Sequence, residues 1–246
     1  MGQKTRKSYH HELDELKEMV EEMGDLSSQA ISLAIDSLVD LDEDKIERVQ
    51  ELDKKIYAYD RHIERKGLKL IALQAPVAKD LRIIGTCLKI ITDLDRIGRY
   101  SGDIAKVSKR MLDQEHMKKL VSIPRMAELT IEMVDLAVQA FMEEDETLID
   151  EIYEKEESVD ALYDEIFREV LTYMIEDSSK ITQGTQYVLV IRYLERIADH
   201  ACNIAERIVY METGEMIEHD VEEKNKNGLR DIEDLEEIRE EEDLKD

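Results

Sequence analysis

The chain has 246 residues, and its 60 Asp and Glu against 34 Lys and Arg give a net charge of −26 at pH 7. Such a charge repels phosphate backbones and anionic lipid surfaces, which excludes nucleic acid as a general partner and direct membrane insertion. Only 9 Gly and 2 Pro are present, too few for the turns of an all-β protein. The composition therefore favours long helices.

Apolar residues recur at helical spacing along most of the chain and predict six helices. They are expected over residues 9–39, 44–73, 76–111, 122–143, 145–175 and 181–212. Pro76 and Pro124 lie at or near the starts of the third and fourth helices, where proline is favoured. Asp and Ser residues at 40–44 and 176–180 supply helix caps.

The two halves of the predicted helical region resemble each other in sequence. Asp95-Arg96-Ile97 matches Glu195-Arg196-Ile197 at an offset of 100 residues, and Asp53-x-x-Ile56 matches Glu156-x-x-Val159 at an offset of 103. A repeat of this length is too long for a solenoid unit. We therefore predict an all-α fold of two tandem three-helix bundles, residues 9–112 and 117–216, related by internal duplication.

Residues 217–246 form an acidic tail outside this repeat. From Glu218 onward the chain has 14 acidic and 5 basic residues, about a third of the net charge. A weak three-residue apolar periodicity persists at Leu229, Ile232, Leu235 and Ile238. We expect a flexible or marginally helical tail, with partner binding as an alternative role.

The two cysteines, Cys87 and Cys202, lie in apolar runs and predict buried thiols rather than a disulfide framework. The N-terminal segment has no apolar stretch typical of a signal peptide, and the chain has no run of about 18 apolar residues. We therefore expect a cytoplasmic protein without a membrane-spanning segment.

Acidic residues follow the margin of the apolar stripe on the last two predicted helices. If these margins face each other, five carboxylates and one amide converge, a donor set that suits divalent or ferric cations. The candidate metal ligands are Glu156, Asp160, Asp164, Glu195, Asp199 and Asn203. The alternative is that these acids are solvated or are neutralised by Arg192, Arg196 and Arg207.

Catalytic motifs are missing from the sequence, which has no Gly-rich phosphate loop, nucleophile elbow or Cys/His zinc spacing. No Glu lies three residues before any of the six histidines, as a di-iron site in a helical bundle requires. His200 lies opposite the core stripe of its helix and is expected at the surface. The sequence favours a protein that is not an enzyme.

Three segments resemble the PhoU family. They are LQAPVAKDLRIIGTCLKIITDLDRIGRYSGDIA at 73–105, VDALYDEIFREVLTYMIED at 159–177 and YLERIADHACNIAERIVYMETGE at 193–215. The N-terminal HELDELKEMVEEMGDLSSQAI is similar as well, so the resemblance covers residues 9–216 and leaves out the acidic tail.

This resemblance implies a non-enzymatic regulator of phosphate uptake and phosphate homeostasis. Members of the family restrain a phosphate ABC transporter, which implies docking on the transporter ATPase at the cytoplasmic side of the membrane. Bacterial members also connect the transporter to a sensor kinase that controls phosphate-starvation genes, and members are often homodimers. Partners expected here are therefore the transporter ATPase, a sensor kinase and a second copy of the chain.

The resemblance also implies a metal site, because family members bind iron, zinc or related ions through paired Glu/Asp-x-x-x-Asp motifs. The second-half candidates match these motifs, and Fe, Zn, Mn and Mg are the candidate ions. Matching acids in the first half are Asp53, Asp60, Asp95 and Asp103. There Arg99 stands where the second half has Asp199. We hypothesise that the Arg99 guanidinium partly replaces a metal charge, which leaves a weaker or absent first site.

Three alternatives remain open at this point. The chain could regulate a low-affinity phosphate permease, a role known for a neighbouring family with the same bundle. It could be a carboxylate-bridged metalloenzyme, although the missing Glu-x-x-His motif argues against that class. It could also be a helical adaptor that binds no metal.

Overall fold

The computed structural model describes residues 2–215, with side chains from residue 9 onward. This part of the chain contains no strand, which confirms the all-α prediction. The helices are α1 (Gly2–Asp40), α2 (Glu43–Gln74), α3 (Ala78–Met111), α4 (Ser122–Glu143), α5 (Ile149–Glu176) and α6 (Ile181–Thr213). Short 3-10 turns, η1 (Glu146–Leu148) and η2 (Ser178–Lys180), precede α5 and α6. The predicted acidic tail at 217–246 lies outside the described residues.

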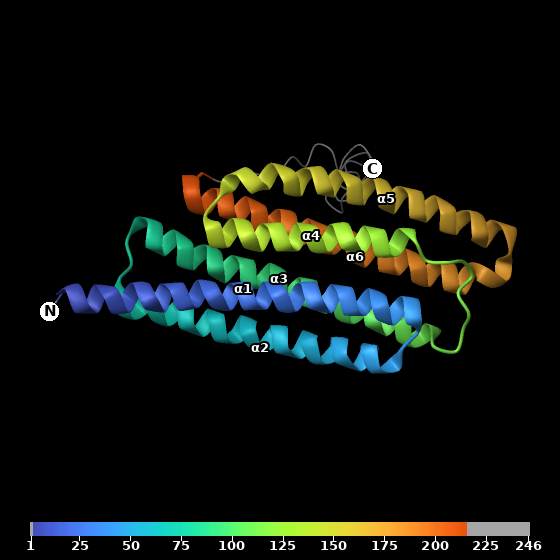
Figure 1. Ribbon diagram of the computed structural model, residues 1–246, viewed down its shortest axis with the longest axis horizontal. Helices are drawn as coiled ribbons and strands as arrows, with labels where there is room; N and C mark the ends of the chain where they lie inside the picture. The colour runs from blue at the N-terminus through green and yellow to red at the C-terminus, as the bar shows by residue number, and fades with distance from the viewer. Residues whose placement is uncertain (1, 216–246) are drawn as a thin grey trace, which may run out of the picture.

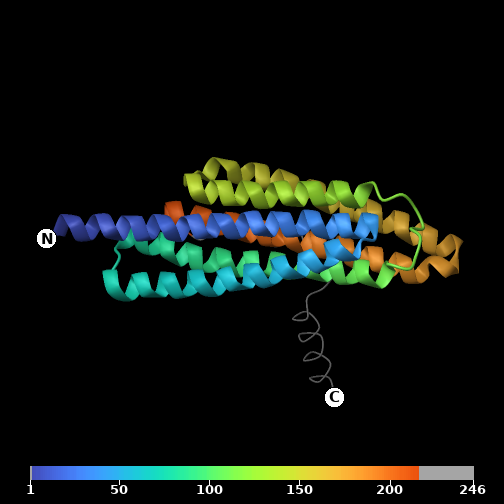
Figure 2. The ribbon, with the colours of Figure 1, turned by 60° about the horizontal axis from the view of Figure 1, so that its bottom comes forward.

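The six helices form two three-helix bundles that lie side by side along the long axis of the molecule (Figure 1). Helices α1, α2 and α3 pack together in the first bundle, and α4, α5 and α6 pack together in the second. The bundles meet through α3 against α6 and through α1 against α4 (Figure 2). The predicted duplicated three-helix architecture is therefore confirmed.

The duplication is visible in the buried face of matching helices. On α2, Ile56 and Ile63 are fully buried, and Val159 and Ile166 take their places on α5. Each such side chain contributes roughly 1.5–3 kcal/mol when it is removed from water. Close packing also explains Gly98 on α3, where an added Cβ would come within 2.9 Å of Ile56 Cδ1. Matched apolar stripes thus hold both bundles together.

The caps predicted at 40–44 and 176–180 are present, at the starts of α2 and η2. Asp42 accepts hydrogen bonds from the backbone N–H groups of Asp44 and Lys45 at 2.9 and 3.2 Å, and Asp177 caps η2 through Ser179. The predicted start of the third helix at Pro76 is wrong, because α3 begins at Ala78. Ala75 adopts a left-handed conformation with φ of 45° and ends α2, so Pro76 lies in the reversal between the helices.

The contact between the bundles half-buries a residue that was predicted at the surface. His200 Nδ1 lies 2.8 Å from Asp93 Oδ1 on α3, and the His200 side chain is only 18% exposed. The matching positions, Tyr193 and Tyr100, stack with ring centroids 5.8 Å apart. The surface prediction was wrong because the side of α6 opposite its own core packs against the other bundle.

Both cysteines are buried free thiols, as predicted, and burial raises the pKa of Cys87 to about 12. Over the described residues, none of the helices has the length and apolar character needed to cross a membrane.

Candidate functional site

The second bundle carries its acidic cluster where α5 packs against α6, and Glu195 lies at its centre. The side chain of Glu195 is 20% exposed, and its Oε1 accepts a hydrogen bond from Arg192 Nη1 at 3.0 Å. Its other oxygen, Oε2, is buried and has no hydrogen-bond partner among the described residues. A buried carboxylate oxygen without a donor is costly, so this atom suits a cation.

The pKa of Glu195 is affected by charged residues on both α5 and α6. Burial and the carboxylates of Asp199 and Asp160 raise its pKa, while Arg192 and Arg196 act in the opposite direction. Arg196 forms two long ion pairs here, with its Nε 4.0 Å from Glu195 Oε2 and its Nη1 3.9 Å from Asp199 Oδ2. Three carboxylates of the predicted set, Asp160, Glu195 and Asp199, therefore influence one another across the two helices.

The remaining predicted ligands lie further from this centre. Asp164 is exposed and pairs with Arg168 Nη2 at 2.9 Å, and Asn203 is exposed on α6. Glu156 lies about one turn from Asp160, beside the buried hydroxyl of Tyr153. Burial, together with Cys202, Glu206 and Glu156, raises the pKa of Tyr153. Helical spacing thus placed all six residues on the α5 and α6 margins but did not distinguish the central three.

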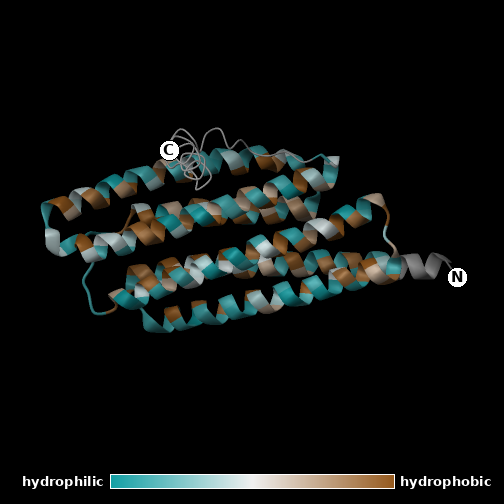
Figure 3. Ribbon diagram, turned by 180° about the vertical axis from the view of Figure 1, so that it is seen from behind, coloured by the Kyte–Doolittle hydropathy of each residue, from teal (hydrophilic) through white to brown (hydrophobic). Residues whose placement is uncertain are grey.

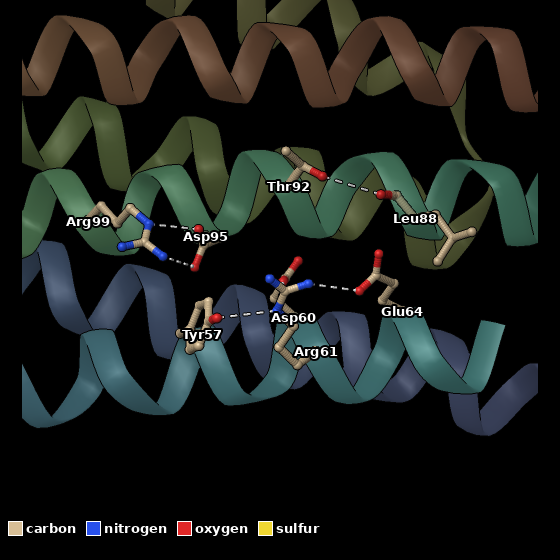
Figure 4. A network of polar contacts seen from close by, with 8 residues as sticks. All are labelled: Tyr57, Asp60, Arg61, Glu64, Leu88, Thr92, Asp95 and Arg99. Atoms are coloured by element: carbon tan, nitrogen blue, oxygen red, sulfur yellow. Dashed lines mark hydrogen bonds and ion pairs between the residues drawn. The ribbon is translucent and has the colours of Figure 1, made fainter. Parts of the chain in front are cut away.

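The first bundle has a different arrangement at the corresponding place between α2 and α3 (Figure 4). Arg99 forms a two-pronged ion pair with Asp95, with Nε 2.8 Å from Oδ2 and Nη2 3.4 Å from Oδ1. Such paired hydrogen bonds are stronger and more specific than a single contact. Arg99 therefore pairs with both oxygens of Asp95, and the hypothesis that its guanidinium partly replaces a metal charge stays a prediction.

Tyr57 on α2 lies between two guanidinium groups. The central carbons of Arg61 and Arg99 are each 5.4 Å from the centroid of the Tyr57 ring, within the range of cation–π attraction. Arg61 Nε also donates a hydrogen bond to the Tyr57 hydroxyl at 3.3 Å, and Arg61 Nη1 lies 3.1 Å from Glu64 Oε2. Both cations are therefore engaged by groups within the bundle.

The other predicted acids of the first bundle lie near Asp95, Arg99 and Tyr57. Burial raises the pKa of both Asp53 and Asp60; the charge of Asp95 adds to the rise, and Arg99 opposes it. Asp103 is turned toward Lys106 Nζ at 2.7 Å. The first bundle therefore keeps its predicted carboxylates but neutralises them in part with its own cations.

The offsets of 103 residues between α2 and α5 and of 100 residues between α3 and α6 show which residues of the two sites correspond. Positions 160, 164 and 199 of the second bundle correspond to 57, 61 and 99 of the first, so three Asp residues are replaced by Tyr57, Arg61 and Arg99. Of these three residues, only Arg99 was singled out from the sequence. The 103-residue offset between α2 and α5, applied to every position, would have identified the other two.

Across the described residues, no group of three or more Asp, Glu, His or Cys side chains is arranged, as it stands, to hold a metal ion. The exposed Asp160 and the 20% exposed Asp199 are on surface helices, where side-chain rotation is inexpensive compared with backbone movement. The donor chemistry at Glu195 fits a cation, whereas the first bundle has two guanidinium groups at the same place.

A family model described as the PhoU domain matches the chain twice, over residues 20–108 and 123–208. The chain is 36% identical over 215 residues to the "phosphate-specific transport system accessory protein PhoU homolog" of Clostridium acetobutylicum, covering 87% of this chain and 98% of that protein. It is 37% identical over 208 residues to the homologue of the same description in Aquifex aeolicus, covering 85% and 94%.

Solved structures give the same result at the level of the fold. The crystal structure of PhoU from Pseudomonas aeruginosa is similar with a TM-score of 0.80 and 30% identity, covering 84% of this chain and 100% of that one. The phosphate transport system regulatory protein PhoU from Streptococcus pneumoniae is similar with a TM-score of 0.79 and 30% identity, covering 85% and 99%.

Proposed function

The chain belongs to the PhoU family, and from this premise we propose that it is a non-enzymatic regulator that restrains phosphate uptake through a phosphate ABC transporter. The observation that carries the proposal is the match of both halves of the chain to the PhoU domain, with relatives covered almost from end to end. Those relatives are named as accessory proteins of phosphate-specific transport. An accessory protein acts by binding, which agrees with the missing catalytic motifs in the sequence.

The regulator acts at the cytoplasmic side of the membrane by docking on the transporter ATPase when phosphate is plentiful. A sensor kinase is a second partner in organisms that couple the transporter to phosphate-starvation genes, and the chain works as a homodimer. Long rigid bundles suit this role, because they present extended helix faces to partners without large internal rearrangement.

A metal ion belongs to the second bundle in this proposal. Glu195, Asp199 and Asp160 are the central ligands, and Glu156, Asp164 and Asn203 complete the set at its margin. The cation is Fe, Zn, Mn or Mg, and it supplies positive charge that neutralises the crowded carboxylates. The buried Oε2 of Glu195, which has no donor among the described residues, supports this assignment.

The first bundle does not fit a metal in the same way. Arg99 already occupies both oxygens of Asp95, and Arg61 with Tyr57 fills the positions that Asp164 and Asp160 hold in the second bundle. We therefore assign no metal to Asp53, Asp60, Asp95 and Asp103. Their charges are balanced in part from within the chain.

Phosphate uptake in cells that lack this gene tests the regulatory role. Uptake of labelled phosphate at high external phosphate should rise in the deletion strain and return to normal when the full chain is supplied. Affinity purification of the tagged chain at high phosphate should recover the transporter ATPase. Unchanged uptake in the deletion strain would contradict the proposal. An effect that persists after deletion of the ABC transporter would instead favour a low-affinity phosphate permease as the target.

A further inference from the structure

The reversal between α2 and α3 exposes large apolar side chains at one end of the molecule. Val77 is 69% exposed and Leu73 is 68% exposed. The exposed apolar residues of this corner, defined as residues 65–82, are Leu68, Leu73, Val77 and Leu81. Among the described residues of α2, α3 and the turn between them, Tyr57 is the one other exposed large apolar residue, so the cluster of four at the corner needs a separate explanation.

The same corner is basic in a strongly acidic protein. Residues 65–82 contain five Lys and Arg and one acid, Asp80, whereas the whole chain carries a net charge of −26. Lys66 and Lys79 pair with Glu15 and Glu144 at 2.7 Å each. Arg65 and Lys69 are exposed, and no ion pair among the described residues involves them. The corner therefore offers apolar surface together with unneutralised positive charge.

The end of α6 lies directly beside this corner (Figures 1 and 2). Arg82 Nε donates a hydrogen bond to the carbonyl oxygen of Met211 at 2.9 Å, and Lys79 Nζ lies 3.6 Å from Glu212 Oε2. A Cβ added to Gly214 would come within 3.8 Å of the Arg82 guanidinium. The described part of the chain therefore ends, at Glu215, next to the basic corner.

The composition of residues 216–246 is complementary to the corner. This segment has 14 acidic and 5 basic residues, and nine of the acids fall within residues 231–243. Apolar residues recur among them at Leu229, Ile232, Leu235 and Ile238. Acidic charge faces basic charge, and spaced apolar side chains match an exposed apolar surface.

We propose that residues 216–246 dock on the α2–α3 corner of the same chain. The 14 residues from Met216 to Leu229 reach up to about 45 Å when extended, at roughly 3.3 Å per residue, so the acidic part can reach a corner that begins beside Gly214. A tether of this kind gives an effective concentration on the order of millimolar, at which weak charge and apolar contacts are sufficient. The docked segment covers the corner and competes with any external partner that binds there.

The opposite end of the molecule provides an internal control. The reversal between α5 and α6 lies at the far end from the α2–α3 corner (Figure 3). It also exposes apolar side chains, among them Leu171, Ile175 and Ile181. Residues 168–185 there contain two basic and three acidic residues, so the charge that would attract an acidic segment is missing. Exposed apolar surface is thus present at both corners, but the basic charge is present at one.

Photo-crosslinking within the full chain tests the proposal. p-Benzoylphenylalanine replaces Val77 in one variant and Ile175, which is 77% exposed, in a matched variant. After irradiation, mass spectrometry should find crosslinks to peptides from residues 216–246 at least about fivefold more often from position 77 than from position 175. Equal yields from both positions, or no such peptide from position 77, would overturn the proposal.

Mixing chains with natural nitrogen and chains labelled with 15N separates docking within a chain from docking between copies. Crosslinks within one isotope support the proposal, and crosslinks that join the two isotopes in statistical proportion contradict it. Circular dichroism confirms that each variant retains its helices, so a missing crosslink is not confused with unfolding.

A charge reversal supplies the second measurement. The full chain with Arg65→Glu and Lys69→Glu should lose about fivefold or more of the crosslink from position 77, because two attractive charges become repulsive. Lys54→Glu with Lys55→Glu makes the same charge change on exposed positions of the same helix and should leave the yield unchanged. Equal losses in both double variants would reject a specific role for the corner.

Discussion

The two bundles solve the same electrostatic problem in different ways. In the second bundle Glu195, Asp199 and Asp160 crowd one another, and Glu195 Oε2 is buried without a hydrogen-bond donor among the described residues. In the first bundle Arg99 neutralises Asp95 directly and stacks on Tyr57. Asp95 thus has both oxygens paired with an internal cation, whereas Glu195 has one oxygen paired with Arg192 and the other buried without a donor. The comparison teaches that duplication preserved the fold while the charge of the site changed.

The largest effect is expected on metal binding. Loss of a group that supports a metal ligand lowers metal affinity about 10- to 100-fold. Asp199→Ala removes a proposed ligand itself, so it should lower the affinity of the full chain for its preferred ion by at least that factor. Asp95→Ala, the matched change in the first bundle, should leave the metal content unchanged. Elemental analysis and calorimetric titration with Fe, Zn, Mn and Mg measure both variants. Equal metal loss from the two variants would remove the distinction between the bundles.

A second variant tests whether the acids of the second bundle can create a metal site in the first bundle. The combined variant Tyr57→Asp, Arg61→Asp and Arg99→Asp gives the first bundle the three acids found at the equivalent second-bundle positions. We expect it to bind more metal per chain than the native protein does. Thermal unfolding with and without added metal checks that the new acids are stabilised by the ion, since a ligand of the folded state alone raises its stability.

A smaller effect is expected on stability when Arg99 is removed. Arg99→Ala leaves Asp95, whose side chain is 16% exposed, without its two-pronged partner. We expect a loss of about 1 kcal/mol in the free energy of unfolding, the upper end for a solvent-exposed ion pair, because the Arg99 side chain is 47% exposed. Urea unfolding of Arg99→Ala, Asp95→Ala and the double variant measures the coupling. Strictly additive losses would show that the pair contributes little.

The pH dependence of stability in the metal-free protein tests the buried carboxylate of Glu195 in the second bundle. The pKa of Glu195 is raised in the folded state, so the folded protein holds this proton to higher pH than the unfolded chain does. Stability therefore falls as the pH rises from the ordinary Glu range through the raised pKa. Glu195→Gln should remove that fall and gain up to about 1 kcal/mol near neutral pH. An unfolding series between pH 4 and 8, roughly the interval in which a raised Glu pKa acts, compares it with Glu206→Gln.

The smallest effect is expected at Tyr57. Tyr57→Phe removes the hydroxyl that accepts a hydrogen bond from Arg61 but keeps the ring between the two guanidinium groups. We expect a loss below about 0.5 kcal/mol, whereas Tyr57→Ala should lose about 1 kcal/mol because both cation–π contacts disappear. Urea unfolding distinguishes the two variants. Similar losses for Phe and Ala would place the stabilisation in the hydrogen bond instead of the ring.

Much of the fold could be predicted because the buried side of each helix is made of apolar residues at helical spacing in the sequence. The stripes that contain Ile56 and Ile166 follow the helical period, and the caps at Asp42 and Asp177 follow from short polar side chains. The start of α3 was misplaced because a proline is compatible with a helix start and with the turn before it. The left-handed Ala75, which decided between them, has no clear mark in the sequence.

The candidate site was predictable in composition but not in arrangement. Spacing identified the acidic margins of α5 and α6, and the repeat identified Arg99 as a departure from them. It did not predict that Arg61 and Arg99 would approach Tyr57 from two different helices. Such contacts depend on the register between helices, which the period of a single helix does not contain.

The sequence by itself determined the six amphipathic helices, their duplication and the positions of the acids along them. Helical period and charge pattern are local properties, which can be read along a single segment of the chain. Only the tertiary structure decided which helix faces meet. The pairing of His200 with Asp93 depends on how α6 packs against α3, and so does the placement of the chain's last described residues beside the basic corner. Packing between helices is set by the shape of many side chains at once, so it emerges only when the whole chain has folded.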